Sequence, residues 1–415
     1  MTPGCAARLQ CAKGIIMDFE KIKEIEKDHC MKVFKRNNIC FERGEGCTLY
    51  DTAGHAYTDF FSGIAVNCLG YNNPDLVKAI CDQAAKITHT SNLFYNIPQA
   101  ELLEKLTKDG MFSRAFLCNS GAEANECAIK IVRKLANESG SGKTTILTAK
   151  ESFHGRTLAT VTATGQEKYS KPFAPLPDGF KYVPFNDLDA LREATTPDVG
   201  AIMLECIQGE SGVRPATYDY LVGAYAFAKQ KGILLILDEV QTGVGRTGKF
   251  YCFEHYGIQP DIVTLAKGLG GGVPIACCLA RGDAAEAFTA GDHGTTFGGG
   301  PLACAAANVV VSKLQDTDLL DRVTAMGDYL SDSLSRKLAR HKFVIDIRGK
   351  GLLRGVQLDE KVNAASIAGK MLSLGVVIGT CGHNTLRIAP PYIITKEEID
   401  DMTDKLEIIF SNTNI

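Results

Sequence analysis

Two short, largely apolar runs between Gly232 and Ala280 constrain the fold of this chain more than any other feature. The first, residues 233–237, ends at Asp238, and the second, residues 262–266, ends at Lys267 before a glycine-rich turn. An apolar run of this length is typical of a strand buried on both faces, as in a parallel sheet covered by helices. Such sheets place their chemistry just past the carboxyl ends of the strands, and both polar residues fall there.

The residue types at these two positions indicate a specific chemistry. A lysine enclosed by glycines and apolar residues loses hydration, which lowers its pKa and leaves a neutral amine that can attack a carbonyl carbon. A carboxylate close by, here Asp238, could keep a pyridine nitrogen protonated. Pyridoxal 5′-phosphate (PLP) requires both groups of its protein. Taken alone, the pair is equally compatible with Asp238 as a helix cap and Lys267 as a surface loop residue.

Length and composition narrow the class of protein. With 415 residues the chain exceeds one ordinary hydrophobic core, so we expect two domains, which 45% hydrophobic residues can fill. The formal net charge of −3 offers no basic field to nucleic acid or an anionic membrane, and no apolar run has transmembrane length. The fifteen cysteines form no C-x-x-C pair. We therefore expect reduced thiols in the cytoplasm, with neither a disulfide framework nor a metal site.

Helix-like and strand-like segments alternate between residues 72 and 291. This alternation predicts an α/β fold whose mainly parallel sheet is covered on both sides. The predicted strands are 114–118, 144–148, 199–206, 233–237 and 273–280, and the predicted helices are 74–87, 121–136 and 218–230.

The C-terminal part predicts a smaller α+β unit. Residues 301–338 are expected to form one or two long helices, followed by strands at 343–347, 352–358 and 386–388. These patterns divide the chain into a large PLP-binding domain (72–300) and a small domain (301–415). Residues 1–71 resemble the N-terminal arm that joins the small domain in a family of PLP enzymes. The first 16 residues are compatible with a cleaved targeting segment, although an extension ahead of a start at Met17 explains them better.

A candidate anion site lies at the start of the helix predicted for 121–136. Ser120 and Glu123 fit a capping box, which is a purely structural role. The same helix start, with Gly121 and Ala122 after Ser120, offers free N–H groups and the positive end of the helix dipole. These groups would favour a phosphate.

The motifs taken together resemble those of the class III aminotransferases, which are PLP enzymes with the aspartate-aminotransferase fold. They are NSGAEANE from Asn119, SFHGRT from Ser152, ECIQGE from Glu205, LDEVQTGVGRTGKF from Leu237, LAKGLGGG from Leu265, GTTFGG from Gly294 and LRIAPP from Leu386. The resemblance runs from about Phe34 to the C-terminus. Within the class, residues 63–67, 154–166 and 291–296 are most similar to the acetylornithine aminotransferases.

The resemblance implies a role for each residue of a PLP site. Lys267 would bind the cofactor covalently and shuttle a proton, and Asp238 would pair with the ring nitrogen. Ser120, Gly121 and Ala122 would hold the phosphate, Phe153 would stack on the ring, Gln241 would bond the ring 3′-oxygen, and Thr296 would reach the phosphate across a dimer interface. A site shared in this way implies an obligate homodimer.

The resemblance also implies how one site takes two substrates. Arg156 would bind the α-carboxylate of a donor that presents its side-chain amine, and later the γ-carboxylate of glutamate. Arg387 would bind the α-carboxylate of glutamate, and Glu210 would pair with Arg387 when no carboxylate is there. Phe34 would touch the substrate, at a position where many relatives have a tyrosine.

The expected activity is transfer of the side-chain amino group of N-acetylornithine to 2-oxoglutarate, in arginine biosynthesis. Ornithine aminotransferases carry tyrosines at the positions of Gly63 and Phe34, and their absence favours an uncharged, acylated α-nitrogen. Succinylornithine, ornithine, 4-aminobutyrate and acetyl-lysine-type donors are alternatives, as is an intramolecular aminomutase. A non-catalytic scaffold would be expected to have lost Lys267 or Asp238.

Overall fold

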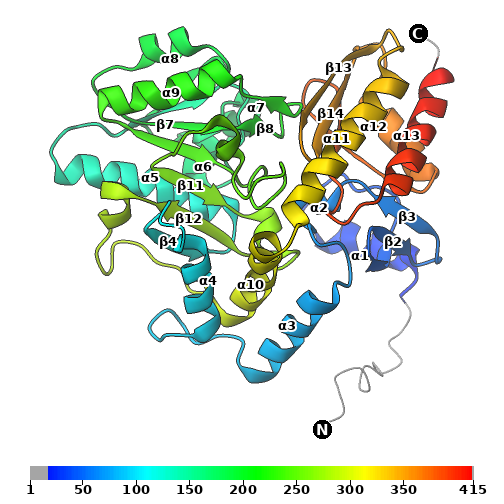
Figure 1. Ribbon diagram of the computed structural model, residues 1–415, viewed down its shortest axis with the longest axis horizontal. Helices are drawn as coiled ribbons and strands as arrows, with labels where there is room; N and C mark the ends of the chain where they lie inside the picture. The colour runs from blue at the N-terminus through cyan, green and yellow to red at the C-terminus, as the bar shows by residue number, and fades with distance from the viewer. Residues whose placement is uncertain (1–16, 414–415) are drawn as a thin grey trace.

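A seven-stranded sheet forms the larger lobe of the computed structural model, which describes residues 17–413 (Figure 1). Its strand order is β4-β12-β11-β10-β7-β5-β6. Only β12 runs antiparallel to its neighbours, β11 and β4. The strands are β4 (Arg114–Cys118), β5 (Thr145–Ala149), β6 (Phe180–Val183), β7 (Val199–Glu205), β10 (Leu234–Asp238), β11 (Ile262–Leu265) and β12 (Ala276–Ala280). The predicted α/β architecture with a mostly parallel sheet is confirmed.

Helices cover both faces of this sheet, which explains why its central strands are apolar throughout. On β10, Ile236 packs with residues of α5 (Gly121–Glu138). Its neighbours Leu235 and Leu237 belong to the core on the other face, with α9 (Tyr218–Lys231). Alternate side chains of one strand thus enter two different cores. The remaining helices of this lobe are α3 (Pro74–Lys86), α4 (Ile97–Thr107), α6 (Leu158–Ala163), α7 (Glu167–Ser170) and α8 (Leu188–Ala194), with a small β8 (Ile207–Gln208) and β9 (Arg214–Pro215) ribbon.

The second lobe contains two four-stranded sheets. One has the order β13-β14-β17-β16 and the other β1-β2-β3-β15. Its strands are β1 (Phe41–Glu45), β2 (Thr48–Asp51), β3 (Ala56–Asp59), β13 (Val344–Lys350), β14 (Leu353–Leu358), β15 (Val376–Val377), β16 (Gly379–Cys381) and β17 (Thr385–Ile388). The pairing of β3 with β15 places N-terminal strands in one sheet with a C-terminal strand. The domain boundaries at 71/72 and 300/301 stay predictions.

Long helices link and cover this lobe. The segment predicted as one or two helices forms α10 (Pro301–Asp316) and α11 (Leu319–Leu338), which break at Thr317. The others are α1 (Phe19–His29), α2 (Ser62–Ala65), α12 (Ala364–Ser373) and α13 (Lys396–Ser411). None of the helices within residues 17–413 is long and apolar enough to cross a membrane.

One local feature differs from the sequence-based expectation. The strand predicted at 273–280 begins only at Ala276, because Gly271 and Gly272 adopt φ values of 58° and 124° and turn the chain after Lys267. No disulfide bond joins the thirteen cysteines within the described residues. The expectation for residues 1–16 lies outside the described residues.

Candidate active site

A cavity of about 430 Å³ opens at the carboxyl ends of the central strands of the large sheet. Nine of the residues singled out from the sequence line it: Ser120, Gly121, Ala122, Phe153, Arg156, Glu210, Asp238, Gln241 and Lys267. They come from the start of α5, the turn after β5, the segment after β7, and the ends of β10 and β11. The parallel strands therefore gather side chains that lie up to about 150 residues apart in the sequence.

Asp238 is the most tightly held charged group in the cavity. It is only 4% exposed. Its Oδ2 accepts a hydrogen bond of 2.7 Å from Asn125 Nδ2 and lies 2.8 Å from His154 Nδ1, and its Oδ1 accepts from Val240 N at 3.0 Å. A carboxylate fixed in this way in a dry site can hold a protonated ring nitrogen.

Asn125 is a site residue that the sequence reasoning missed. Its Nδ2 also donates to the carbonyl oxygen of His154 at 2.7 Å, and its Oδ1 accepts from Thr264 Oγ1 at 2.7 Å. It therefore ties α5 to β11 and to the turn after β5. The signal in the sequence was a single amide on the face of α5 that also carries Ala124 and Ala128.

Glu205 was missed as well, although it ends its strand as Asp238 does. The two residues are register partners of β7 and β10. Glu205 lines the cavity, and its Oε2 accepts from Phe153 N at 3.1 Å. Burial raises the pKa of Glu205 well above its usual range, and the negative charge of Asp238 adds to the rise. Both effects favour the neutral form of the carboxyl group beside Phe153.

Lys267 follows β11 and begins a short 3₁₀ turn (Lys267–Gly270). Its φ of 41° is unusual for a residue with a side chain and is of the kind that costs about 1–3 kcal/mol. Its amine makes no hydrogen bond within residues 17–413. Burial lowers the pKa of Lys267 to about 8, against the opposing effect of Glu210. A fraction of the amine is therefore neutral and nucleophilic at physiological pH.

The start of α5 forms the predicted anion site. Ser120 is the N-cap residue, and its Oγ accepts from Glu123 N at 3.3 Å, which is one half of the expected capping box. The other half is not formed, because Glu123 Oε2 accepts from Asn119 N instead of Ser120 N. A Cβ atom at Gly121 would lie 2.7 Å from both methyl groups of Val240. Gly121 therefore lets the helix start pack directly on the segment after Asp238. The first residues of α5 line the cavity, and the free N–H groups of this helix start can bind a phosphate there.

Arg387 lies behind the cavity rather than in its lining. It is 3% exposed, and its Nη1 donates to Glu210 Oε1 at 2.5 Å and to the carbonyl oxygen of Gly209 at 3.3 Å. Gln241 Nε2 donates to the same Glu210 oxygen at 3.2 Å. Burial alone would raise the pKa of Glu210, but Arg387 and Lys267 outweigh it and the pKa is lowered. The arrangement keeps both charges paired in a dry site.

Arg156 has the opposite environment at the edge of the same cavity. Its side chain is exposed and forms no ion pair within residues 17–413. The guanidinium carbon lies 4.1 Å from the ring centre of Tyr169 and 5.4 Å from that of Phe153. Its N–H edge therefore has no acidic partner and can receive a carboxylate from a ligand.

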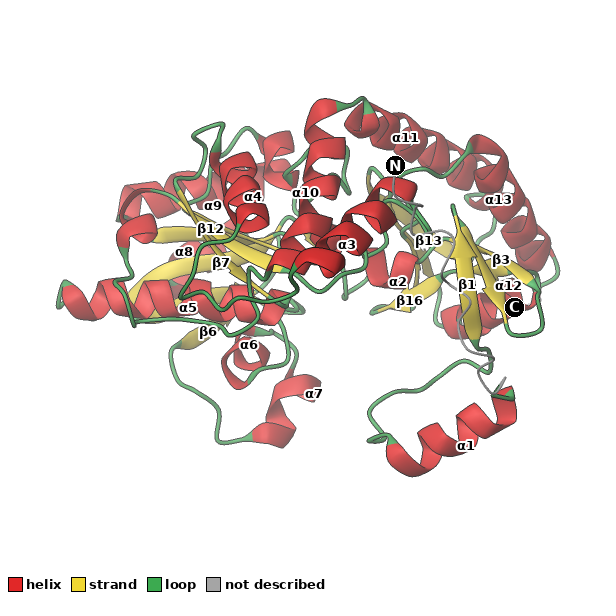
Figure 2. Ribbon diagram, turned by 90° about the horizontal axis from the view of Figure 1, so that it is seen from below, coloured by secondary structure: helices red, strands yellow, loops and turns green. Residues whose placement is uncertain are grey.

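Besides Arg387, two of the predicted site residues lie outside the cavity. Thr296 is exposed on a loop beside His89 and Asn92. Phe34 is 69% exposed and lies 5.2 Å from the Arg36 guanidinium carbon, on the N-terminal segment that follows α1 (Figure 2). The structure does not bring either residue to the other ten within one chain, and their roles stay predictions.

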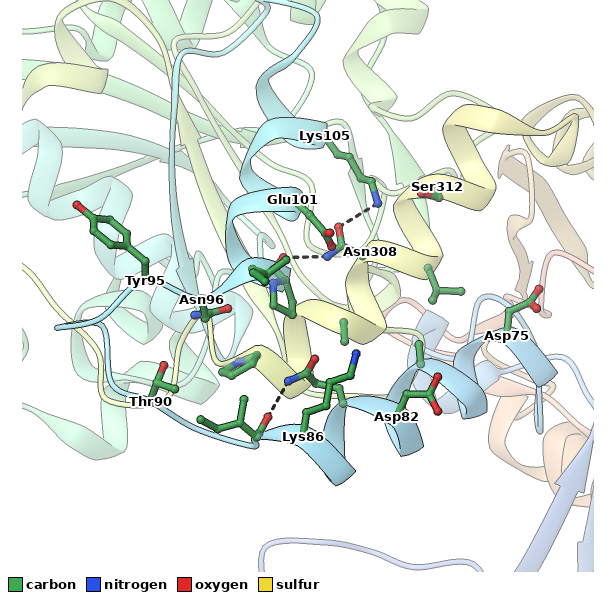
Figure 3. Close-up of a pocket in the computed structure, with 18 of the residues that line it drawn as sticks. Asp75, Asp82, Lys86, Thr90, Tyr95, Asn96, Glu101, Lys105, Asn308 and Ser312 are labelled. Atoms are coloured by element: carbon green, nitrogen blue, oxygen red, sulfur yellow. Dashed lines mark hydrogen bonds between the residues drawn. The ribbon is translucent and has the colours of Figure 1, made fainter. Parts of the chain in front are cut away.

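A larger pocket of about 790 Å³ lies between α3, α4 and α10 and shares no lining residue with the cavity (Figure 3). Its wall includes Asn308, which donates to the carbonyl oxygen of Pro98 and accepts from Lys105. Two of its lining residues, Tyr95 and Ile97, are strongly exposed apolar side chains, as are Leu93, Phe94 and Phe297 outside the lining. Within residues 17–413, no group of three or more His, Cys, Asp or Glu residues could hold a metal ion.

Comparisons with known proteins agree on the kind of enzyme. The family profile described as aminotransferase class-III matches residues 31–410. The acetylornithine aminotransferase of Caldanaerobacter subterraneus subsp. tengcongensis is 48% identical over 93% of this chain and 98% of its own length. That of Methanothermobacter thermautotrophicus is 45% identical over 95% of this chain and 100% of its own length.

Solved structures show the same fold. The ornithine aminotransferase from Toxoplasma gondii ME49 superposes with a TM-score of 0.91 at 32% identity, covering 95% of either chain. The N-acetylornithine aminotransferase from Stenotrophomonas maltophilia K279a gives a TM-score of 0.80 at 37% identity, covering 94% of this chain and 98% of its own.

Proposed function

The chain belongs to the class-III aminotransferases, and from that premise we propose that it transfers the side-chain amino group of N-acetylornithine to 2-oxoglutarate with PLP as its cofactor. The products would be N-acetylglutamate semialdehyde and glutamate, a step of arginine biosynthesis. One observation carries the proposal: a single cavity joins Lys267 and the buried Asp238 to a helix start and to the exposed Arg156, and its lining residue Glu210 is paired with the buried Arg387 behind it.

The chemistry of the donors in the cavity fits PLP. The start of α5 at Ser120 and Gly121 suits the phosphate, and the buried Asp238 suits the ring nitrogen. Thr242 lines the cavity and its Oγ1 has no partner within the described residues, so a polar atom is free for a ligand. Phe153 provides an aromatic face for the ring, and Lys267 Nζ can hold the aldehyde carbon covalently.

The residues of the chain would divide the reaction between them. When bound, PLP supplies the electron sink that weakens the C–H bond of the substrate carbon carrying the amine. Asp238, fixed by Asn125 and His154, would keep a proton on the ring nitrogen throughout. Lys267 Nζ, once displaced by the substrate amine, would take the proton from the substrate carbon and return it on the cofactor side. Its lowered pKa makes it a base near neutral pH.

The two arginines would take the two substrates in turn. With N-acetylornithine in the site, Arg156 would bind the α-carboxylate while Glu210 keeps Arg387 neutralised. With glutamate, the α-carboxylate would replace Glu210 at Arg387, and Arg156 would bind the γ-carboxylate. Two separate carboxylate sites favour a two-substrate transaminase over an aminomutase.

We also propose a homodimer with shared active sites. Five large apolar side chains are strongly exposed: Leu93, Phe94, Tyr95, Ile97 and Phe297. Exposed apolar side chains in such number are typical of an interface between subunits. Thr296 directly precedes Phe297, which supports the proposal that Thr296 reaches the phosphate site of a partner subunit. A cytoplasmic location stays a prediction from the scattered cysteines.

A donor panel tests the substrate. Glutamate formation from 2-oxoglutarate would be measured with N-acetylornithine, succinylornithine, ornithine and 4-aminobutyrate at one pH. The chain lacks the tyrosines that ornithine aminotransferases carry at the positions of Gly63 and Phe34, whose hydroxyls would accompany the ammonium group of free ornithine. N-acetylornithine should therefore exceed ornithine in kcat/KM by at least about tenfold. Equal values, or a preference for ornithine, would overturn the substrate and leave the aminotransferase assignment intact.

A further inference from the structure

Arg156 is held at the edge of the cavity by aromatic rings alone. Its guanidinium carbon lies 4.1 Å from the ring centre of Tyr169, closer than to Phe153 at 5.4 Å. No acidic side chain within residues 17–413 pairs with it. A guanidinium that lies over an aromatic face keeps its N–H edge free, whereas an ion pair would occupy that edge. Tyr169 is therefore the main contact that selects one position for Arg156.

Tyr169 is itself anchored to the core of the site. It belongs to the short helix α7, which lies near α6 and β6 (Figure 2), and its backbone N–H donates to the carbonyl oxygen of Gln166 at 3.0 Å. Gln166 is 7% exposed, and its Nε2 donates to the carbonyl oxygen of Ser152 at 3.0 Å. Ser152 immediately precedes Phe153. The segment that carries Tyr169 is thus hydrogen-bonded to the turn that carries the ring-stacking residue.

The rings of Tyr169 and Phe153 also touch each other. Their centres lie 6.1 Å apart at an interplanar angle of 87°, the edge-to-face arrangement that aromatic pairs prefer. The two rings and the guanidinium of Arg156 therefore form one contact cluster, which extends from Phe153 in the cavity to Arg156 at its edge. This cluster would fix the distance between the reacting end of a substrate and Arg156, which would bind its carboxylate.

We propose that Tyr169 is a positioning residue that sets the affinity for carboxylate-bearing substrates by holding Arg156 in its receptive orientation. This inference rests on the proposed function, in which Arg156 binds the α-carboxylate of N-acetylornithine and the γ-carboxylate of glutamate. Loss of the ring frees the arginine to sample other rotamers. Both substrates then bind more weakly, while the chemistry at Lys267 is unchanged.

The test compares Tyr169→Leu with Tyr169→Phe in the PLP-loaded enzyme. A cation–π contact at an exposed site predicts that Tyr169→Leu raises KM for N-acetylornithine and for glutamate about two- to fivefold, with kcat within about twofold. Tyr169→Phe keeps the ring and should behave as the parent. Calorimetry with glutarate, an unreactive dicarboxylate, should show the same loss of affinity in Tyr169→Leu. Tyr182→Leu, which removes a partly exposed tyrosine from the neighbouring β6, serves as the matched control.

A donor without the carboxylate separates positioning from general damage. N-acetyl-1,4-diaminobutane is N-acetylornithine without that group, and Tyr169→Leu should leave its kcat/KM unchanged. An equal loss with both donors, or a fall in kcat with KM unmoved, overturns the inference. Arg156→Leu separates a failure of the Tyr169 inference from a failure of the proposed carboxylate site. If it raises KM and Tyr169→Leu does not, Tyr169 has no such role; if Arg156→Leu itself leaves KM unchanged, the proposed carboxylate site is wrong.

Discussion

The two ends of the cavity are built in opposite ways. At the inner end, Asp238 is 4% exposed and is fixed by hydrogen bonds from Asn125 and Val240. At the outer end, Arg156 is exposed and is held by the rings of Tyr169 and Phe153. The inner end must stabilise charge that develops during the reaction, so it needs rigid, dry contacts. The outer end must admit and release two substrates, so its cation stays hydrated.

The two arginines show the same contrast in one residue type. Arg387 is 3% exposed and has Glu210 as an internal counter-ion, because an unpaired buried cation would be costly. Arg156 needs no such partner, since water solvates it. The comparison predicts which kinetic constant each end controls. Changes at the inner end should lower kcat, and changes at the outer end should raise KM.

The largest effect is expected from Asp238→Ala. The variant should still bind PLP through the phosphate site at the start of α5. Without the carboxylate, nothing keeps the ring nitrogen protonated, so kcat should fall by roughly 10²- to 10⁴-fold. Steady-state kinetics with saturating substrates measures the change, and PLP content by absorbance confirms loading. A kcat close to that of the parent would refute the contrast between the two ends.

The next effect concerns the pH dependence of Lys267. Only the neutral amine attacks the aldehyde of PLP, and burial lowers the pKa of Lys267 from 10.5 to about 8. The rate of PLP capture by the cofactor-free enzyme should therefore rise with pH and level off above about 8. From pH 8 down to pH 6 it should fall about fiftyfold, because half of the amine is neutral at the pKa and the neutral fraction drops about tenfold per pH unit well below it. Stopped-flow absorbance follows the capture. A midpoint near 10.5 would show that the amine is not desolvated.

A smaller effect is expected from Glu210→Ala. Removal of the carboxylate leaves Arg387 unpaired in the half-reaction with N-acetylornithine, where it would compete with Arg156 for the substrate carboxylate. We expect kcat/KM for that half-reaction to fall roughly tenfold, or about 1.4 kcal/mol. The kcat/KM of the half-reaction with glutamate should stay the same or rise, because glutamate supplies its own carboxylate to Arg387. Each half-reaction can be followed separately by cofactor absorbance, with Glu210→Gln as the control. Equal losses of kcat/KM in both half-reactions would contradict the proposal that the glutamate α-carboxylate replaces Glu210 at Arg387.

Much of the fold could be predicted from the sequence because its strongest signals are local. The run ending at Asp238 is apolar at every position, and the helix from Gly121 begins with a capping serine. Both patterns depend only on neighbouring residues. The direction of β12, antiparallel to β11 and β4, depends on how the chain returns to the sheet edge. No local pattern encodes that path.

The site was harder to predict where a role depends on a contact made in three dimensions. Asn125 touches Asp238 across 113 residues of sequence, and the family motifs alone did not single it out. Tyr169 lies near Arg156 only because α7 folds back beside the turn of Phe153. Glu205 could have been found, since it ends its strand as Asp238 does.

The most direct test of the account is the position of the cofactor on the chain. The purified enzyme would be loaded with PLP, reduced with borohydride, digested and analysed by mass spectrometry. The buried, desolvated amine at the end of β11 predicts a single adduct of reduced PLP on the peptide that contains Lys267. An adduct on another lysine, or none after PLP loading, would contradict the assignment of the inner end of the cavity as the place where the chemistry occurs.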